Sequence, residues 1–148
     1  MKNIYSTLKR RYAGRFIRQR DRRARGAEVL EAALVMPILL LLVFGMIEFG
    51  YFLYLKHNLQ AAAREGARVG STLNSNDAEA VSKAGAFLTA ANLSPGRFQI
   101  SSSTSGDTIT VTVQATWGSV GILHLYPLIP ISDSKVVRGS AVMRKEGL

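Results

Sequence analysis

The stretch AALVMPILLLLVFGMI, residues 32–47, decides the fold of this chain, because it contains no charged residue. After Glu48 the apolar sequence resumes as FGYFLYL and ends before Lys56. A bilayer core requires about 20 residues of helix at 1.5 Å per residue, so residues 30–55 are long enough to span a membrane with some tilt. We therefore expect one transmembrane helix.

An apolar stretch can also belong to a buried core helix or to a cleaved signal peptide. A buried core helix is disfavoured, because a chain of 148 residues has little structure with which to surround so uniformly apolar a rod. A cleaved signal peptide, with Ala61–Ala63 as the small residues of its cleavage site, is also disfavoured. Its apolar region would be roughly 7 to 15 residues long, which is shorter than this stretch.

The positive charge of the chain lies before this helix. Residues 1–25 contain ten Lys or Arg against a single Asp, whereas the remaining residues contain nine basic and nine acidic side chains. The net charge of +9 is therefore a property of the N-terminal tail. The positive-inside rule then predicts that the N-terminus is cytoplasmic and that residues 57–148 lie outside.

Two glutamates interrupt the apolar sequence in different ways. Glu48 falls near the outer interface, where we expect its carboxylate either to reach water or to contact a partner helix. Glu31 lies just inside the inner boundary, where an anion gains from a cationic partner. Pro37 removes a backbone hydrogen bond from the span and predicts a local bend.

The residues around Glu31 resemble the type IV prepilin processing signature, in which Gly26 and Ala27 precede a glutamate at the fifth position after the glycine. The longer stretch 26–71 resembles the TadE-like family of pseudopilins. The matching elements are Glu31, Pro37, Phe44-Gly45, Glu48-Phe49-Gly50 and the AAREGAR sequence of residues 62–68. The closing sequence GSAVMRKEG, residues 139–147, is also similar to the last strand of that family.

This resemblance implies a pilin-like fold and a defined maturation. A prepilin peptidase would cut after Gly26, and the new amino terminus at Ala27 would usually be methylated. The carboxylate of Glu31 would then meet the amino terminus of a neighbouring subunit, so that each charge in the membrane gains a partner of opposite sign. The implied partners are the prepilin peptidase, other pilins and pseudopilins, the pilus assembly platform and the lipid bilayer.

The helix is expected to continue out of the membrane to residue 73. A stripe of small and apolar residues recurs along one face at alternating four-residue and three-residue spacing, and it includes Leu59, Ala62, Gly66 and Val69. The stripe would pack either against the chain's own domain or against other subunits, and the sequence does not separate these alternatives.

The remaining residues, 74–148, predict a small extracytoplasmic α+β module. Asn76 followed by Glu79 is a capping pair for a second helix over residues 77–91. Alternating sequences at 97–104 and 108–116 predict a hairpin, and residues 135–144 predict a third strand of the same antiparallel sheet. The domain organisation is then a leader over 1–26, a long helix over 27–73 and this module.

The residues give no basis for an enzyme. The chain has no cysteine, and its two histidines lack further ligands at metal-binding spacing, so we expect no metal and no cofactor. The arginine-rich tail could bind nucleic acid, but a cytoplasmic segment beside a membrane has sufficient reason to be basic, and we expect no nucleic-acid partner.

The resemblance to the TadE-like family implies a minor pseudopilin of a Tad or Flp type IV pilus, an adhesive filament. The protein would be a single-pass protein of the cytoplasmic membrane before assembly and would then enter or prime an extracellular pilus. The alternative is a single-pass envelope protein whose outer domain binds a partner without entering a filament.

Overall fold

The computed structural model describes the backbone of residues 2–123 and 131–146, and the side chains of these residues from Gly26 onward. The chain forms two compact units, Met1–Val43 and Phe44–Leu148. We call the second unit the module. Residues 124–130, in the connection between the last two strands, lie outside the described residues, and His124, the second histidine of the chain, is one of them.

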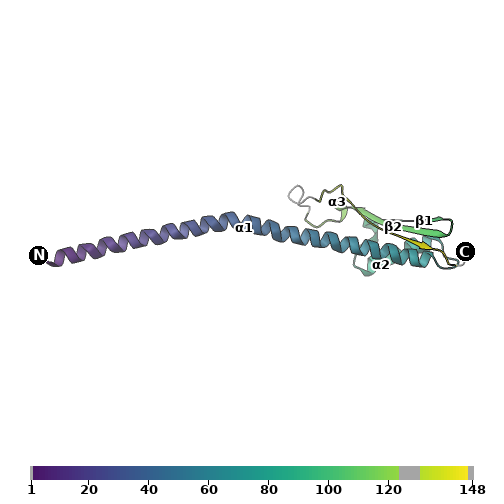
Figure 1. The fold of residues 1–148 in the computed structure, drawn as a ribbon, viewed down its shortest axis with the longest axis horizontal. Coiled ribbons are helices and arrows are strands. Elements are labelled where there is room, and N and C mark those ends of the chain that lie inside the picture. Colours follow the sequence, from purple (N-terminus) through teal and green to yellow (C-terminus); the bar gives the residue numbers. More distant parts are fainter. Residues whose placement is uncertain (1, 124–130, 147–148) are drawn as a thin grey trace. The chain divides into compact units, whose positions relative to one another are not determined.

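Helix α1 extends over Lys2–Gly70 and passes through Pro37 (Figure 1). Gly26 is therefore part of a helix, and α1 ends three residues before the predicted end at residue 73. Two serines satisfy backbone carbonyls at the C-terminal end of α1. The Ser71 hydroxyl donates to the Arg68 carbonyl at 2.9 Å, and the Ser75 hydroxyl donates to the Gly70 carbonyl at 2.7 Å. Asn74 then adopts a left-handed conformation with φ of 63°, which turns the chain away from the helix axis.

Helix α2, Asp77–Ala90, begins as the sequence predicts. The Asn76 side chain accepts a hydrogen bond from the backbone N–H of Glu79 at 2.9 Å, which satisfies a donor in the first turn. The buried face of α2 is formed by Ala80, Ala84 and Leu88. A single 3-10 turn, η1 at Pro95–Arg97, then leads into the sheet.

The sheet is antiparallel in the order β1-β2-β3, with strands Gln99–Ser105, Thr108–Thr116 and Val136–Arg144. A two-residue turn joins β1 and β2, and Gly106 supplies the positive φ of 58° that the turn requires. A short helix α3, Trp117–Val120, follows β2 directly. The predicted α+β fold, with a long apolar helix, a second helix and three antiparallel strands, is confirmed.

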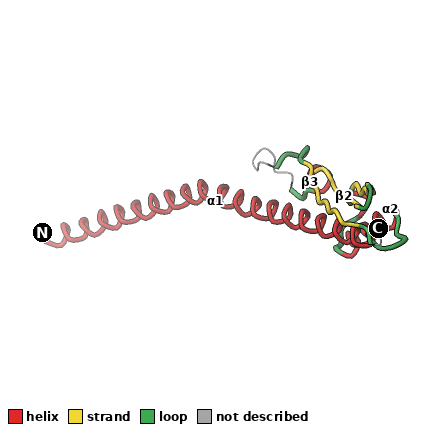
Figure 2. The backbone as a smooth tube through the Cα atoms, turned by 45° about the vertical axis from the view of Figure 1, so that its right-hand side comes forward, coloured by secondary structure: helices red, strands yellow, loops and turns green. Residues whose placement is uncertain are grey.

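The core of the module lies between the sheet, α2 and the last part of α1, which Figure 2 shows running beside the strands. Two glycines permit this close packing. A Cβ on Gly66 would lie 2.8 Å from the Ala80 carbonyl oxygen, and a Cβ on Gly139 would overlap the backbone of Leu59 and Gln60. Helix α2 and strand β3 therefore pack directly on the backbone of α1.

Polar side chains fix the register between α1 and the sheet. The Gln60 side-chain amide donates to the Ser140 carbonyl at 2.7 Å, and its oxygen accepts from the Ser140 backbone N–H at 3.3 Å. The Tyr54 hydroxyl donates to the carbonyl of Ala91 at 2.9 Å, just after α2 ends. The part of α1 after Phe44 is thus an integral element of the module.

Candidate membrane and assembly site

The predicted cleavage and assembly residues lie on exposed helix. Gly26, Ala27 and Glu31 are all exposed on α1 within the first unit, as is Glu28. Ala27 and Glu31 are four residues apart, which places them on one face of the helix with an axial separation of about 6 Å. Both positions are therefore exposed along the same face of α1.

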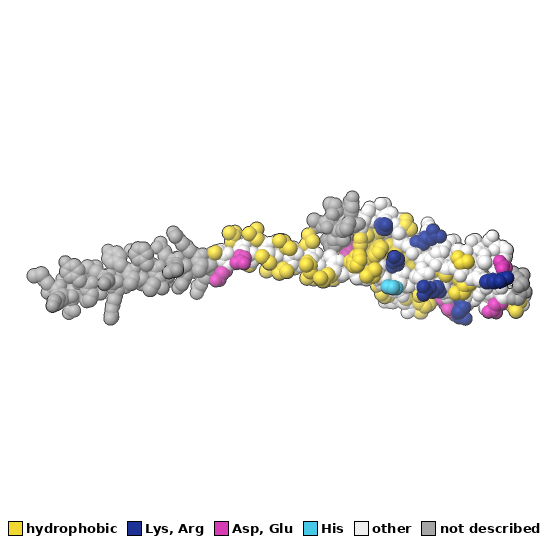
Figure 3. Space-filling view, in the orientation of Figure 1, with side chains coloured by type: hydrophobic (Ala, Val, Ile, Leu, Met, Phe, Trp, Pro, Cys, Tyr) yellow, Lys and Arg dark blue, Asp and Glu magenta, His cyan; other side chains and the backbone are white. Residues whose placement is uncertain are grey.

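An apolar surface follows Glu31 along α1. All residues from Gly26 to Ile47 are exposed except Gly45, which is half-buried. Figure 3 shows hydrophobic side chains covering this stretch, whereas the Lys and Arg side chains it draws gather over the module. Helix α1 is long and apolar enough over Gly26–Gly70 to cross a membrane, and its most apolar window is not buried by the rest of the chain. A large exposed apolar surface of this kind requires lipid or another chain to cover it.

Glu48 interrupts this exposed surface, and the structure corrects our expectation for it. Its side chain is 1% exposed and reaches neither water nor a partner helix. One carboxylate oxygen accepts from the Trp117 indole N–H at 3.1 Å, and the other accepts from the Leu123 backbone N–H at 2.9 Å. The module itself therefore supplies both donors, as a buried carboxylate requires.

Aromatic rings hold Trp117 in place beside Glu48. The Phe52 ring meets Trp117 edge-on with centroids 5.4 Å apart, and the Tyr51 ring lies tilted at 6.1 Å. Trp117 is itself buried at the start of α3. The first turn of α1 inside the module and the residues after β2 are therefore joined by one buried polar and aromatic cluster, formed by Glu48, Tyr51, Phe52, Trp117 and the Leu123 backbone.

The packing stripe is used inside the module. Leu59, Ala62 and Gly66 are buried in its core and Val69 is half-buried, so packing within the chain's own domain is the alternative that the structure shows. Gly50 differs from Gly66, because it is exposed and a Cβ there would meet nothing within 4 Å.

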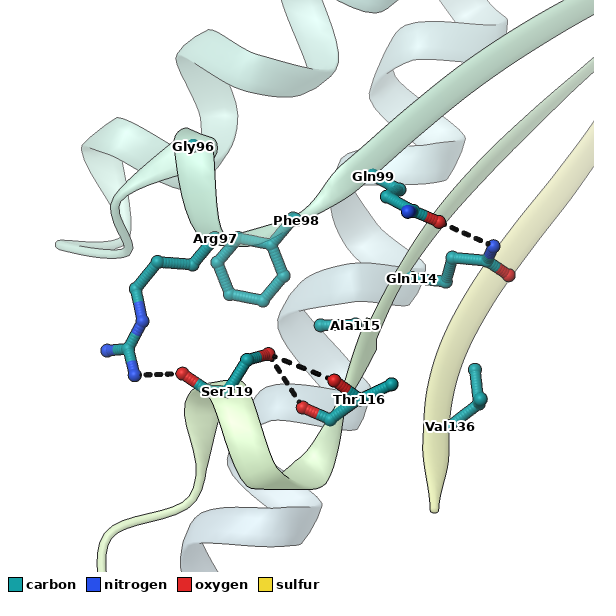
Figure 4. A pocket seen from close by; sticks show the side chains of 9 residues that line it. All are labelled: Gly96, Arg97, Phe98, Gln99, Gln114, Ala115, Thr116, Ser119 and Val136. Carbon is teal, nitrogen blue, oxygen red and sulfur yellow. Dashed lines mark hydrogen bonds between the residues drawn. The ribbon is translucent and has the colours of Figure 1, made fainter. Parts of the chain in front are cut away.

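A separate open pocket of about 290 Å³ lies at the end of the β1-β2 hairpin nearest α3 (Figure 4). Its polar groups bond to one another: the Arg97 guanidinium donates to the Ser119 carbonyl, and the Gln114 amide donates to Gln99 at 3.1 Å. Sequence reasoning singled out none of these residues. Among the described residues no group of three or more His, Asp or Glu gathers as a metal site would require.

The ion pair between Glu65 and Arg68, which lies outside the apolar surface, shifts the pKa of both side chains. The Arg68 guanidinium donates two hydrogen bonds to the Glu65 carboxylate, at 2.8 and 2.9 Å. These bonds lower the pKa of Glu65 below its ordinary value and raise the pKa of Arg68. Both side chains lie toward the surface of the module, so the pair contributes little to its stability.

Sequence reasoning found Glu48 but not its partners. The available signal was that an acidic residue in an apolar run requires donors, and that the chain contains a single tryptophan, whose indole is such a donor. Trp117 lies 69 residues after Glu48, so only the folded module shows that they meet.

Comparison with known proteins gives one family. Residues 26–68 match the family described as TadE-like protein, and this stretch begins at the predicted cleavage glycine and includes Glu31, Glu48 and the stripe residues Leu59, Ala62 and Gly66. No curated protein and no solved structure matches the chain. This match agrees with the predicted resemblance to the TadE-like family over residues 26–68, where α1 is also long and apolar enough to cross a membrane.

Proposed function

We propose that this chain is a minor pseudopilin of a Tad or Flp pilus, trimmed by a prepilin peptidase after Gly26 and then assembled through α1. The observation that carries the proposal is that the TadE-like stretch begins at Gly26 and leads directly into an exposed apolar helix. The basic leader would hold the N-terminus inside during insertion. The role is structural, without catalysis or a cofactor.

The proposed assembly contact is an ion pair in the apolar region. Cleavage would create an ammonium group at Ala27, and the exposed Glu31 carboxylate of a neighbouring subunit would accept it. A charge in a low-dielectric environment is costly unless it is paired, so an assembled bundle would favour the pairing over isolated subunits. The partners are therefore other pilins and the assembly platform, with the peptidase acting first.

A matched pair of variants tests this contact. Glu31→Gln removes the proposed anion, whereas Glu28→Gln removes a charge that is also exposed, three residues earlier on the same helix. We expect both variants to insert into the membrane and to be trimmed. Only Glu31→Gln should be lost from sheared filaments and from cross-linked complexes with other pilins. Equal recovery of the two variants in these fractions would contradict the proposed ion pair.

One observation favours the alternative of a membrane-anchored envelope protein that never enters a filament. The packing stripe is buried inside the module, so Leu59, Ala62 and Gly66 are not free to contact other subunits. An anchor of this kind should tolerate Glu31→Gln with no change in its complexes. The same pair of variants therefore separates the two functions.

A further inference from the structure

The end of the apolar surface can be located from the length of the span. A hydrocarbon core of about 30 Å takes about 20 helical residues. If the span begins between Ala27 and Ala32, it ends between about Met46 and Tyr51 on the module side. Tilt moves this end further along the helix. Glu48 therefore lies at the lipid boundary or just inside it, while the exposed Lys56 and His57 lie beyond it.

Residues 121–123 of the module form a loop that is held at the same depth as Glu48. The Leu123 backbone N–H donates to the Glu48 carboxylate at 2.9 Å, so the loop lies within hydrogen-bonding distance of a residue at the boundary. This contact lies wholly within the module. The loop cannot stand far above the bilayer while that bond and the buried Trp117 contact are made.

The side chains of this loop are apolar and open. Ile122 is 52% exposed and Leu123 is 37% exposed. On the adjoining part of α1, Phe49 and Leu53 are also exposed, at 54% and 40%. We call these four exposed residues, which all lie within the module near the level of Glu48, the boundary patch. Exposed apolar side chains at that depth favour lipid over water.

We propose that the boundary patch is a second membrane contact, in which Ile122 and Leu123 enter the lipid interface beside the span. The module then rests on the bilayer instead of standing free above it. Glu48 gains a physical role in this arrangement, because the loop that it holds also covers its carboxylate where lipid would otherwise meet an unsatisfied charge. The inference rests on membrane insertion of α1, which belongs to the proposed function.

Three single-cysteine variants of the full chain test this contact, since the natural chain has no cysteine. Ile122→Cys places a label in the boundary patch, and Leu39→Cys places one within the span. Leu73→Cys is the matched control, because Leu73 is 65% exposed and follows the end of α1. That end, at Gly70, lies about 33 Å beyond Glu48 along the helix axis. Each variant carries an environment-sensitive NBD fluorophore.

The labelled chains are reconstituted as single copies in nanodiscs of phosphatidylethanolamine and phosphatidylglycerol, with nitroxide lipid or aqueous iodide as quencher. We expect the labels at positions 39 and 122 to emit at shorter wavelength and to be quenched by nitroxide lipid. The label at position 73 should be quenched by iodide.

An immersed label at position 39 with an aqueous label at position 122 would overturn the second membrane contact and leave the span intact. An aqueous label at position 39 would overturn membrane insertion, and with it both proposals. If the label at position 122 becomes shielded only in vesicles that hold many copies, another subunit covers the patch and the lipid contact is wrong.

Discussion

Replacing Glu48 with alanine tests the buried cluster most severely. The change removes the acceptor of the Trp117 indole N–H and of the Leu123 N–H in a site that is 1% exposed. Leaving one buried donor unsatisfied costs about 1–3 kcal/mol, so two donors give a loss of about 2–6 kcal/mol in the free energy of unfolding, or about 1–3 kcal/mol where water satisfies one of them. A domain has a total of about 5–15 kcal/mol, so the loss is large.

Glu48→Gln should lower the free energy of unfolding by less than Glu48→Ala does. The amide oxygen keeps one acceptor, but the amide nitrogen is turned toward a donor, so we expect a loss of about 1–2 kcal/mol. Glu31→Ala is the control, because Glu31 is exposed and lies outside the module, and its effect should stay within about 0.5 kcal/mol.

The assay is urea unfolding of the full chain in detergent micelles, followed by the fluorescence of Trp117, the only tryptophan. The expected order of stability is wild type, then Glu48→Gln, then Glu48→Ala, with altered Trp117 emission in the folded state of both Glu48 variants. If Glu48→Ala and Glu31→Ala unfold at the same urea concentration, the buried carboxylate does not hold the module together and the reasoning fails.

Three further predictions concern the module. Gly139→Ala should destabilise the module by about 1–3 kcal/mol in urea unfolding, because the new Cβ would overlap the backbone of α1. The control, Gly50→Ala, should be neutral or slightly stabilising. Equal effects of the two substitutions would contradict the close packing of β3 on α1. Asn76→Ala should cost about 1 kcal/mol by loss of the N-cap of α2, and an unchanged urea midpoint would contradict this. Arg68→Ala should return the pKa of Glu65 toward its ordinary value in an NMR titration. In the wild type the folded-state pKa of Glu65 is lowered, so the small stabilisation from the pair is present above the ordinary pKa and is lost as pH falls through the lowered value; an unshifted Glu65 titration in the wild type would contradict the pairing.

Local patterns predicted most of the elements. The alternation of TITVTVQAT set β2 at Thr108–Thr116, and the Asn76 cap set the start of α2, because both depend on residues close in the sequence. The apolar stretch 32–47 predicted the exposed helix for the same reason. The short helix α3 carried no such local signal.

Contacts between distant residues were harder to predict. The stripe on α1 was recognised, but its period says only that one face packs, not whether a sheet of the same chain or another subunit covers it. The burial of Glu48 depends on Trp117 and Leu123, which are brought to it by the packing of the whole module. The unit boundary at Phe44 follows from the same contacts, because they bind the end of the predicted span to the module.

The most direct test of the central claim is the intact mass of the chain recovered from membranes of cells with an active prepilin peptidase. The account predicts a mature chain that begins at Ala27, with or without one added methyl group, and a full-length chain when the peptidase is absent. Gly26→Val should also remain full-length in the presence of the peptidase. A wild-type chain that keeps residues 1–26 in cells whose other pilins are trimmed would contradict the claim that this protein is a processed pseudopilin.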